Sequence, residues 1–398
     1  MSQTIKAGDA SSTLRLWRLS DRKTRRLLTA LAAALAAMLG LSIGVELSSR
    51  IYGDYFAMWS FARFAMTHPV AAIYDPAAVH AFQHQCDPSF TGVMPFPYPP
   101  SYILLLLPFG LLPIALGWTV WSATGLCAYM AAIFAGRWRS DALLFVALAP
   151  ATVMSLISGQ NGLFSSALMV AGVRLMDSRP IAAGVLFGLM SFKPQVGLLI
   201  PVALIAARNW RAFAAAAAAA IGLAGLASAA FGVSIWPTWI GALRTHWDGY
   251  VTQGNATRIK MPTITANLEM LGVGPQVAQL VQLAAFGAAA MLVWAIFRRR
   301  QDAWALAALL VGCFVATPYA LFYDLPAVTF AIVVVVMEMG RADRPWHWAE
   351  VLVLLLAFLM PYAQFVDLVL PVPVNGAALV LLFMVIVRRA LEPRLEAT

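Results

Sequence analysis

Long apolar runs recur along the whole chain and constrain its fold more than any other feature. Of its 398 residues, 61% are hydrophobic and 11% are charged, whereas about a quarter of the residues in an average soluble domain are charged. A transmembrane helix needs about 20 apolar residues. The sequence therefore predicts an all-α polytopic integral membrane protein with about 12 transmembrane helices. The candidate spans are 27–47, 101–136, 142–158, 161–176, 180–192, 194–207, 212–233, 276–297, 302–317, 322–340, 347–365 and 371–388.

The positions of the basic residues predict how the chain is oriented in the membrane. If the run 101–136 crosses once, after an initial half-helix, 21 of the 27 Lys and Arg residues lie on one side. Cytoplasmic loops carry an excess of Lys and Arg, so we expect that side, with both termini, in the cytoplasm of a bacterial-type plasma (inner) membrane. This clustering also argues against nucleic acid as the reason for the net charge of +9. The expected parts are a basic tail at 1–26, a single transmembrane domain at 27–390 with long outer loops at about 48–100 and 234–275, and a second tail at 391–398.

Two features of the spans predict how they pack. Lys193-Pro194 separates the runs 180–192 and 194–207, and interrupted helices at membrane depth tend to line a cavity, because unpaired backbone groups avoid lipid. The tract AFAAAAAAAIGLAGLASAA, residues 212–230, predicts a helix of small residues that packs closely against its neighbours.

The stretch RIYGDYFAMWSFARF, residues 50–64, places Asp54 at the start of the first outer loop. Asp54 could cap the helix that begins after it, or it could act as a general base facing an outer cavity, and the two roles are compatible. The aromatic residues that follow predict a helix resting at the level of the lipid headgroups, where it could also guide a lipid substrate. These residues are Tyr55, Phe56, Trp59 and Phe61.

Two short motifs carry polar residues at the predicted outer ends of spans. In SGQNGLFSS, residues 158–166, Asn161-Gly162 is explained as a turn, but the Gln160 amide needs partners, which a hydroxylated ligand would supply. In MSFKPQVG, residues 190–197, Lys193 could snorkel to the interface. Equally, Lys193 could hold a phosphate as a compact cation, with Gln195 as a polar partner.

Two further motifs flank these residues in sequence. TPYALFYDLPA, residues 317–327, places Asp324 beside Tyr319, and either a helix start or binding of sugar hydroxyls explains the carboxylate. GVMPFPYPPSY, residues 92–102, is a proline-rich approach to the next span. We expect its Tyr98 to anchor the chain at the membrane interface.

The order of these motifs resembles that of one protein family. An Asp at the start of the first outer loop is followed by IYDP (73–76), YPP (98–100), GQNG (159–162), FKPQ (192–195) and TPYALFYDL (317–325). This series is similar to the polyprenyl-phosphate-sugar-dependent membrane glycosyltransferases of family 87, whose characterised members are mycobacterial α-mannosyltransferases of the GT-C superfamily. The resemblance covers about residues 50–330.

The resemblance implies a GT-C-type bundle with an outward-facing cavity, interfacial helices in the long first outer loop and a donor lipid that enters from the bilayer. It also implies a catalytic Asp in the first outer loop, which matches Asp54. Relatives often carry His or Asp just before the YD of the last motif, where this chain has Leu321 and Phe322.

The function that follows is transfer of a hexose, with mannose expected, from a polyprenyl-phosphate donor to an acceptor hydroxyl on a glycan or glycolipid at the outer face. Asp54 is the expected base. The donor phosphate ligands are expected to be Lys193, Arg63, Arg258 and Lys260, and the sugar or acceptor ligands Gln160, Asn161, Gln195, Tyr319 and Asp324. A monophosphate needs less charge neutralisation than a pyrophosphate, so neither a metal nor another cofactor is expected.

The alternative is a polytopic transporter or flippase of a lipid-linked sugar, which would use the same polar residues as binding sites. Interrupted helices favour it. Against it, the sequence shows no internal repeat and gathers its polar residues on one predicted face, whereas a transport path has ionisable groups spread through the spans.

Overall fold

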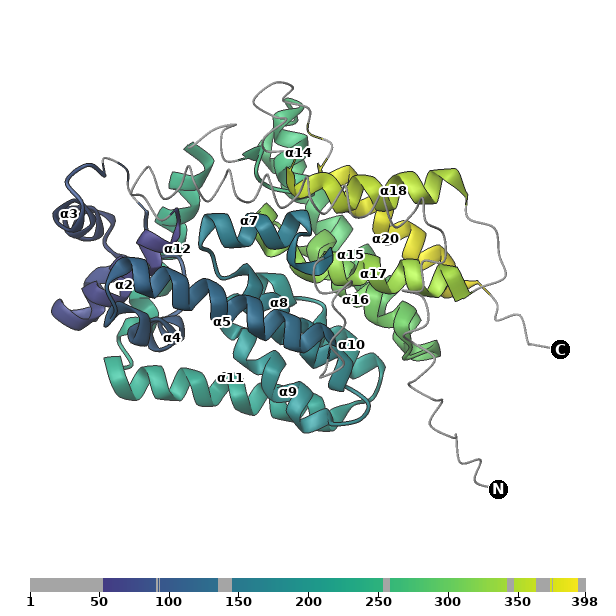
Figure 1. Ribbon diagram of the computed structural model, residues 1–398, viewed down its shortest axis with the longest axis horizontal. Coiled ribbons are helices and arrows are strands. Elements are labelled where there is room, and N and C mark those ends of the chain that lie inside the picture. The colour runs from purple at the N-terminus through teal and green to yellow at the C-terminus, as the bar shows by residue number, and fades with distance from the viewer. Residues whose placement is uncertain are drawn as a thin grey trace.

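The computed structural model describes residues 53–90, 92, 94–134, 145–252, 258–341, 347–362, 373 and 375–392. Every regular element in these ranges is a helix (Figure 1). The predicted first span, 27–47, lies outside the described residues, as do parts of 142–158, 347–365 and 371–388.

The N-terminal half of the described chain places short helices before the first long one. Their bounds are α2 (Tyr55–Thr67), η2 (Val70–Tyr74), α3 (Pro76–Cys86), α4 (Pro100–Gly110), α5 (Ile114–Phe134), α7 (Pro150–Ser158), α8 (Gly162–Leu175), α9 (Pro180–Leu189), η3 (Met190–Phe192), η4 (Pro194–Gly197) and α10 (Ile200–Ala206). In Figure 1, α2, α3 and α4 gather at one end of the molecule together with the later helix α12.

The C-terminal half contains two further long apolar helices, α11 and α15. The bounds are α11 (Trp210–Phe231), α12 (Ile235–Thr252), α14 (Ile264–Met270), α15 (Pro275–Arg299), α16 (Ala303–Ala316), η5 (Phe322–Asp324), α17 (Pro326–Arg341), α18 (Trp348–Leu359), η6 (Met360–Tyr362) and α20 (Asn375–Leu391). The described part of the expected second outer loop thus includes the helices α12 and α14.

Three described helices, α5, α11 and α15, are long and apolar enough to cross a membrane, and seven shorter helical segments are also apolar. The predicted run 101–136 consists of α4 and α5 with a break between them. At 1.5 Å per residue, the 11 residues of α4 rise about 16 Å, roughly half of a 30 Å hydrocarbon core. This arrangement agrees with the expected half-helix followed by a single span.

The small-residue tract forms most of α11 and packs closely against α9, as its composition predicts. A Cβ atom added at Gly184 of α9 would lie 2.2 Å from the carbonyl oxygen of Ala212, and one at Gly188 would lie 2.4 Å from that of Ala216. Glycines four residues apart share one helix face and let two backbones meet. This contact, visible along the lower edge of Figure 1, confirms the prediction.

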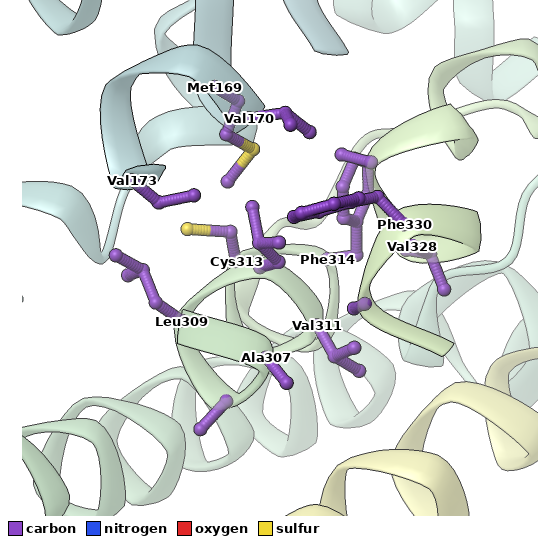
Figure 2. Packing of buried hydrophobic residues seen from close by; sticks show 14 of the residues in the cluster. Met169, Val170, Val173, Ala307, Leu309, Val311, Cys313, Phe314, Val328 and Phe330 are labelled. Carbon is purple, nitrogen blue, oxygen red and sulfur yellow. The ribbon is translucent and has the colours of Figure 1, made fainter. Parts of the chain in front are cut away.

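The central helix α16 is surrounded by apolar side chains, and 11 of its 14 residues are buried. Figure 2 shows Cys313 and Phe314 of α16 between α8, which contributes Met169 and Val173, and α17, which contributes Phe330. A helix that is apolar on all sides belongs in the interior of a bundle. The motif TPYALFYDL therefore begins at the end of a helix that the core holds in place.

The aromatic residues of α2 pack against protein. Tyr55, Phe56 and Phe61 are buried, and Trp59 is half-buried and donates to the carbonyl oxygen of Leu112 at 2.9 Å. The expectation that these four side chains rest among lipid headgroups is therefore wrong for the three buried ones. The reason is that the helical spacing of apolar residues that suits a membrane surface suits a protein core equally well.

The contact between α9 and α11 predicts that Gly184→Ala lowers the thermal stability of the purified protein. Overpacking a tight contact costs about 1–3 kcal/mol, and here the added methyl group meets backbone, which yields little. Gly222→Ala on α11 is the matched control, because no atom lies within 4 Å of its added Cβ. Equal unfolding temperatures for the two variants would contradict the close packing.

Candidate active site

Asp54 and Gln160 meet through their side chains although 106 residues separate them. Gln160 Nε2 donates to Asp54 Oδ2 at 2.8 Å, and the Asp54 amide donates to the carbonyl oxygen of Ser158, also at 2.8 Å. The start of α2 is thereby fixed to the end of α7. Gly159 ends α7 in the left-handed region, at φ +64°, and so turns Gln160 out of the helix.

Asp54 occupies the residue before α2, but its side chain makes no capping hydrogen bond. Since the carboxylate accepts from the Gln160 amide instead, the capping interpretation does not explain this residue. No hydrogen bond from the described part of the chain reaches Asp54 Oδ1, which leaves this oxygen available for a proton.

Burial is the main influence on the acidity of Asp54 and raises its pKa above the ordinary value. The hydrogen bond from Gln160 and the positive charges of Lys260 and Lys193 act in the opposite direction without cancelling it. A carboxylate with a raised pKa is a stronger base than an exposed one.

A buried ion pair binds the next residue of this turn, Asn161. Lys193 Nζ is 2.5 Å from Asp324 Oδ1 and 2.9 Å from Asn161 Oδ1, and it lies 5.5 Å from the centre of the Tyr323 ring. Asp324 Oδ2 accepts from the backbone amide of Leu321 at 3.1 Å. Lys193 is buried and paired, which contradicts snorkelling to the interface, whereas its expected binding of the donor phosphate stays a prediction.

Gly162 explains how the motif GQNG meets the motif TPYALFYDL. A Cβ atom added at Gly162 would lie 1.7 Å from the carbonyl oxygen of Tyr323 and 3.0 Å from Ser155 Oγ. Only glycine allows these two backbones to approach so closely. The contact brings Asn161 and Asp324 to the same lysine.

The remaining predicted ligands differ in their surroundings. Arg258 forms an ion pair with Glu269 at 2.6 Å, and Arg63 is exposed, with its guanidinium 5.0 Å from the Trp59 ring centre. Lys260 is exposed and close enough to Asp54 for its charge to lower the Asp54 pKa.

The two other predicted sugar or acceptor ligands, Gln195 and Tyr319, are half-buried. Gln195 lies in η4, and Tyr319 lies in the connection between α16 and η5. There the Thr317 hydroxyl donates to the Tyr319 carbonyl oxygen at 3.0 Å and accepts from the Tyr319 amide at 3.3 Å. Among the described residues, no three His, Cys, Asp or Glu side chains group as metal ligands would.

Sequence reasoning missed the role of two tyrosines. Tyr98 is buried rather than interfacial, and its hydroxyl donates to Gln160 Oε1 at 3.4 Å. Tyr102 accepts from Asn161 Nδ2 at 2.9 Å. The prediction of Tyr98 as an interface anchor is therefore wrong, because its ring packs on Tyr102 with centres 4.4 Å apart. The available signal was the run of aromatic residues at 96, 98 and 102.

The fold and these contacts define a helical protein with apolar helices suited to a membrane and a buried polar site at the meeting point of three motifs. The chain belongs to glycosyltransferase family 87, whose family model matches residues 96–322. The protein is therefore a glycosyltransferase, and membership of the GT-C superfamily is consistent with this assignment. No curated protein and no solved structure matches the chain.

The matched range includes Gln160, Asn161 and Lys193, and it begins after Asp54 and ends two residues before Asp324. The structure brings both carboxylates to residues inside the matched range. The family assignment also favours glycosyl transfer over the alternative of transport.

The environment of Asp54 predicts how the transfer rate depends on pH. If Asp54 is the base, it acts when deprotonated, and the rate should rise with pH through an apparent pKa above the ordinary value of about 3.9 for Asp. Gln160→Leu removes a bond that favours the ionised form, so it should shift this rise to still higher pH. The measurement is a pH–rate profile.

The matched control is Gln301→Leu. Gln301 is exposed and donates to the carbonyl oxygen of Ala207 at 3.4 Å, in a different part of the bundle, so the pH–rate profile should be unchanged. A profile that Gln160→Leu leaves in place would show that this amide does not tune the essential carboxylate.

Proposed function

We propose that this glycosyltransferase moves a hexose, with mannose as the expected sugar, from a polyprenyl-phosphate donor to a hydroxyl of a glycan or glycolipid acceptor. The observation that carries the proposal is the Asp54 carboxylate, which is half-buried, is held by Gln160 at 2.8 Å and has a pKa that desolvation raises. This is the arrangement that a general base requires: one oxygen fixed, and a pKa raised toward the working pH.

The reaction needs one proton transfer and one displacement. The acceptor hydroxyl oxygen attacks the anomeric carbon while Asp54 Oδ1 takes its proton. The bond between the anomeric carbon and the phosphate oxygen breaks, and the polyprenyl phosphate leaves with the electron pair. Alignment of donor and acceptor contributes several kcal/mol in addition.

The departing phosphate gathers negative charge, and fixed cations stabilise such charge in a site that excludes water. Lys260 supports this role best, because it is exposed and lies within electrostatic reach of Asp54. Arg63 and Arg258 remain as further candidates, although Arg258 is paired with Glu269. Gln195 and Tyr319 are proposed to bind hydroxyls of the sugar or acceptor.

A mainly apolar cavity of about 490 Å³ supports a lipid-linked donor. Its lining includes Pro318 of the motif TPYALFYDL and Leu198, which lies three residues after the motif FKPQ, and Leu283 of α15 is exposed. The cavity is lined by Leu198, Thr265, Gln279, Gln282, Leu283, Phe286, Ala316 and Pro318. An isoprenoid chain is apolar and fits such surroundings.

Sugar transfer is tested with purified wild-type protein in nanodiscs. Labelled polyprenyl-phosphate mannose, glucose, galactose and arabinose are supplied with a membrane extract as acceptor, and labelled nucleotide-linked mannose is supplied in a separate reaction. We expect label to move from mannose donor into the extract, with release of polyprenyl phosphate. Transfer from a different hexose donor alone would correct the sugar, and transfer only from a nucleotide-linked sugar would refute the lipid donor.

We also propose a single transmembrane domain of about 12 crossings, with cytoplasmic termini and the site at the periplasmic or extracellular face of a plasma (inner) membrane. The three long apolar helices and the basic loops support it. An impermeant thiol reagent applied to intact cells should label Lys260→Cys and spare Arg208→Cys, in a background with the native cysteines replaced. The opposite pattern would invert the topology.

A further inference from the structure

We propose that Lys193 and Asp324 are positioning residues whose buried ion pair fixes the Gln160–Asn161 turn, and thereby the Asp54 carboxylate, and that neither side chain binds substrate. The inference rests on the proposed role of Asp54 as the base. It assigns to Lys193 and Asp324 a different role from the phosphate and sugar binding expected from the sequence.

Both members of the pair are withdrawn from solvent and hydrogen-bonded to protein. The side chain of Lys193 is 3% exposed and that of Asp324 is 0% exposed. Lys193 directs two of its hydrogens at Asp324 and Asn161, and its charge faces the Tyr323 ring. Asp324 uses its second oxygen to accept from the Leu321 amide.

A substrate phosphate could reach Lys193 only by entering a buried position next to the Asp324 carboxylate. Removing one member of a buried ion pair leaves an uncompensated charge in a medium of low polarity, which is strongly unfavourable. A phosphate would also have to replace Asp324, a carboxylate already 2.5 Å away. The geometry suits a permanent structural contact far better than a reversible ligand site.

The pair connects directly to the residue that holds the base. Lys193 donates to Asn161 Oδ1 at 2.9 Å, and Asn161 Nδ2 donates to the Tyr102 hydroxyl at 2.9 Å. Both polar ends of the Asn161 side chain are therefore fixed. The adjacent residue, Gln160, donates to Asp54 at 2.8 Å. Motion of Asn161 would consequently displace Gln160 and, with it, Asp54.

The backbone reinforces this connection from the other side. Gly162 follows the turn and lies against the Tyr323 carbonyl, one residue before Asp324. The motifs GQNG, FKPQ and TPYALFYDL thus meet at one ion pair. The proposed base, Asp54, is bound to Gln160 of the first motif. A misplacement of about 1 Å at a reacting group can reduce the rate about 100-fold.

The test is a double-mutant cycle with Lys193→Met, Asp324→Asn and the combined variant, measured as kcat and donor KM in nanodiscs. We expect each single variant to lose about 100-fold in kcat with donor KM changed less than about threefold. The combined variant, which contains no unpaired charge, should recover at least about tenfold over the weaker single variant. Such coupling is the signature of a shared contact.

A direct role in phosphate binding predicts a different pattern and would overturn the inference. Lys193→Met would then raise donor KM, Asp324→Asn would leave it unchanged, and the combined variant would be no better than Lys193→Met. Near-normal kcat in either single variant would overturn it as well.

Asn161→Ala provides a second measurement that keeps the ion pair intact, in case a single charge change prevents folding. It should lower kcat about tenfold or more, with little change in donor KM. Since Asn161 is the connection between the pair and Gln160, kcat within twofold of wild type would refute the positioning role.

The control is the buried ion pair of Glu350 and Arg389, which joins α18 to α20 at 2.5 and 2.9 Å. Arg389→Met should lower the unfolding temperature and leave kcat within about twofold, because neither residue contacts the site. If Arg389→Met lost as much kcat as Lys193→Met, general destabilisation would explain both losses, and the inference would be overturned.

Failure of this inference is distinguishable from failure of the proposed function. Wild-type protein and Asp54→Asn are assayed beside the cycle. Absence of transfer by wild type, or full transfer by Asp54→Asn, would refute the proposed function and the inference with it. Transfer that depends on Asp54 but shows no coupling between Lys193 and Asp324 refutes the inference alone.

Discussion

The ion pair between Lys193 and Asp324 is the contact on which the arrangement of the site depends. Its two residues lie 131 positions apart and are both buried. Water is excluded from this region, so each charge is tolerated only because the other is present. The surrounding polar groups then take their positions from the pair: Asn161 accepts from the lysine, and the Leu321 amide donates to the aspartate.

Small residues allow close backbone contacts at two places in the fold. Gly162 lets α8 begin against the Tyr323 carbonyl, and Gly184 and Gly188 let α9 lie close to α11. The buried helix α16 supplies a rigid start for the segment that ends at Asp324 (Figure 2). Closely packed helices thus hold a few polar side chains at this site, and Asp54 is the member of this set with an oxygen that no described residue engages.

Much of this could be predicted from the sequence, and the failures have identifiable physical causes. Hydrophobic runs and small residues predicted the helical class and the α9–α11 contact, because these depend on local composition. The sequence placed Asp54 and Gln160 on the same predicted face of the membrane domain, but it did not predict that their side chains meet. The pairing of Lys193 with Asp324 could not be derived, since a lysine beside an apolar run suits a snorkelling, a ligand-binding and a paired side chain alike.

Aromatic residues were the second source of error. Tyr55, Phe61 and Tyr98 were expected at a lipid interface and are buried instead. Their spacing records that one face is apolar but not whether protein or lipid covers it. The helix α12 was also missed. Its segment mixes tryptophans with polar residues and is too polar for a span, so it was assigned to a loop.

The central claim is that Asp54 removes the acceptor proton. The most direct measurement compares wild type with Asp54→Asn for donor binding and for transfer, in protein of equal thermal stability. An amide keeps the shape and can still accept from Gln160 but cannot take a proton. The account predicts unchanged donor affinity and a loss of transfer of about 10²–10⁴-fold. Transfer within tenfold of wild type would contradict it.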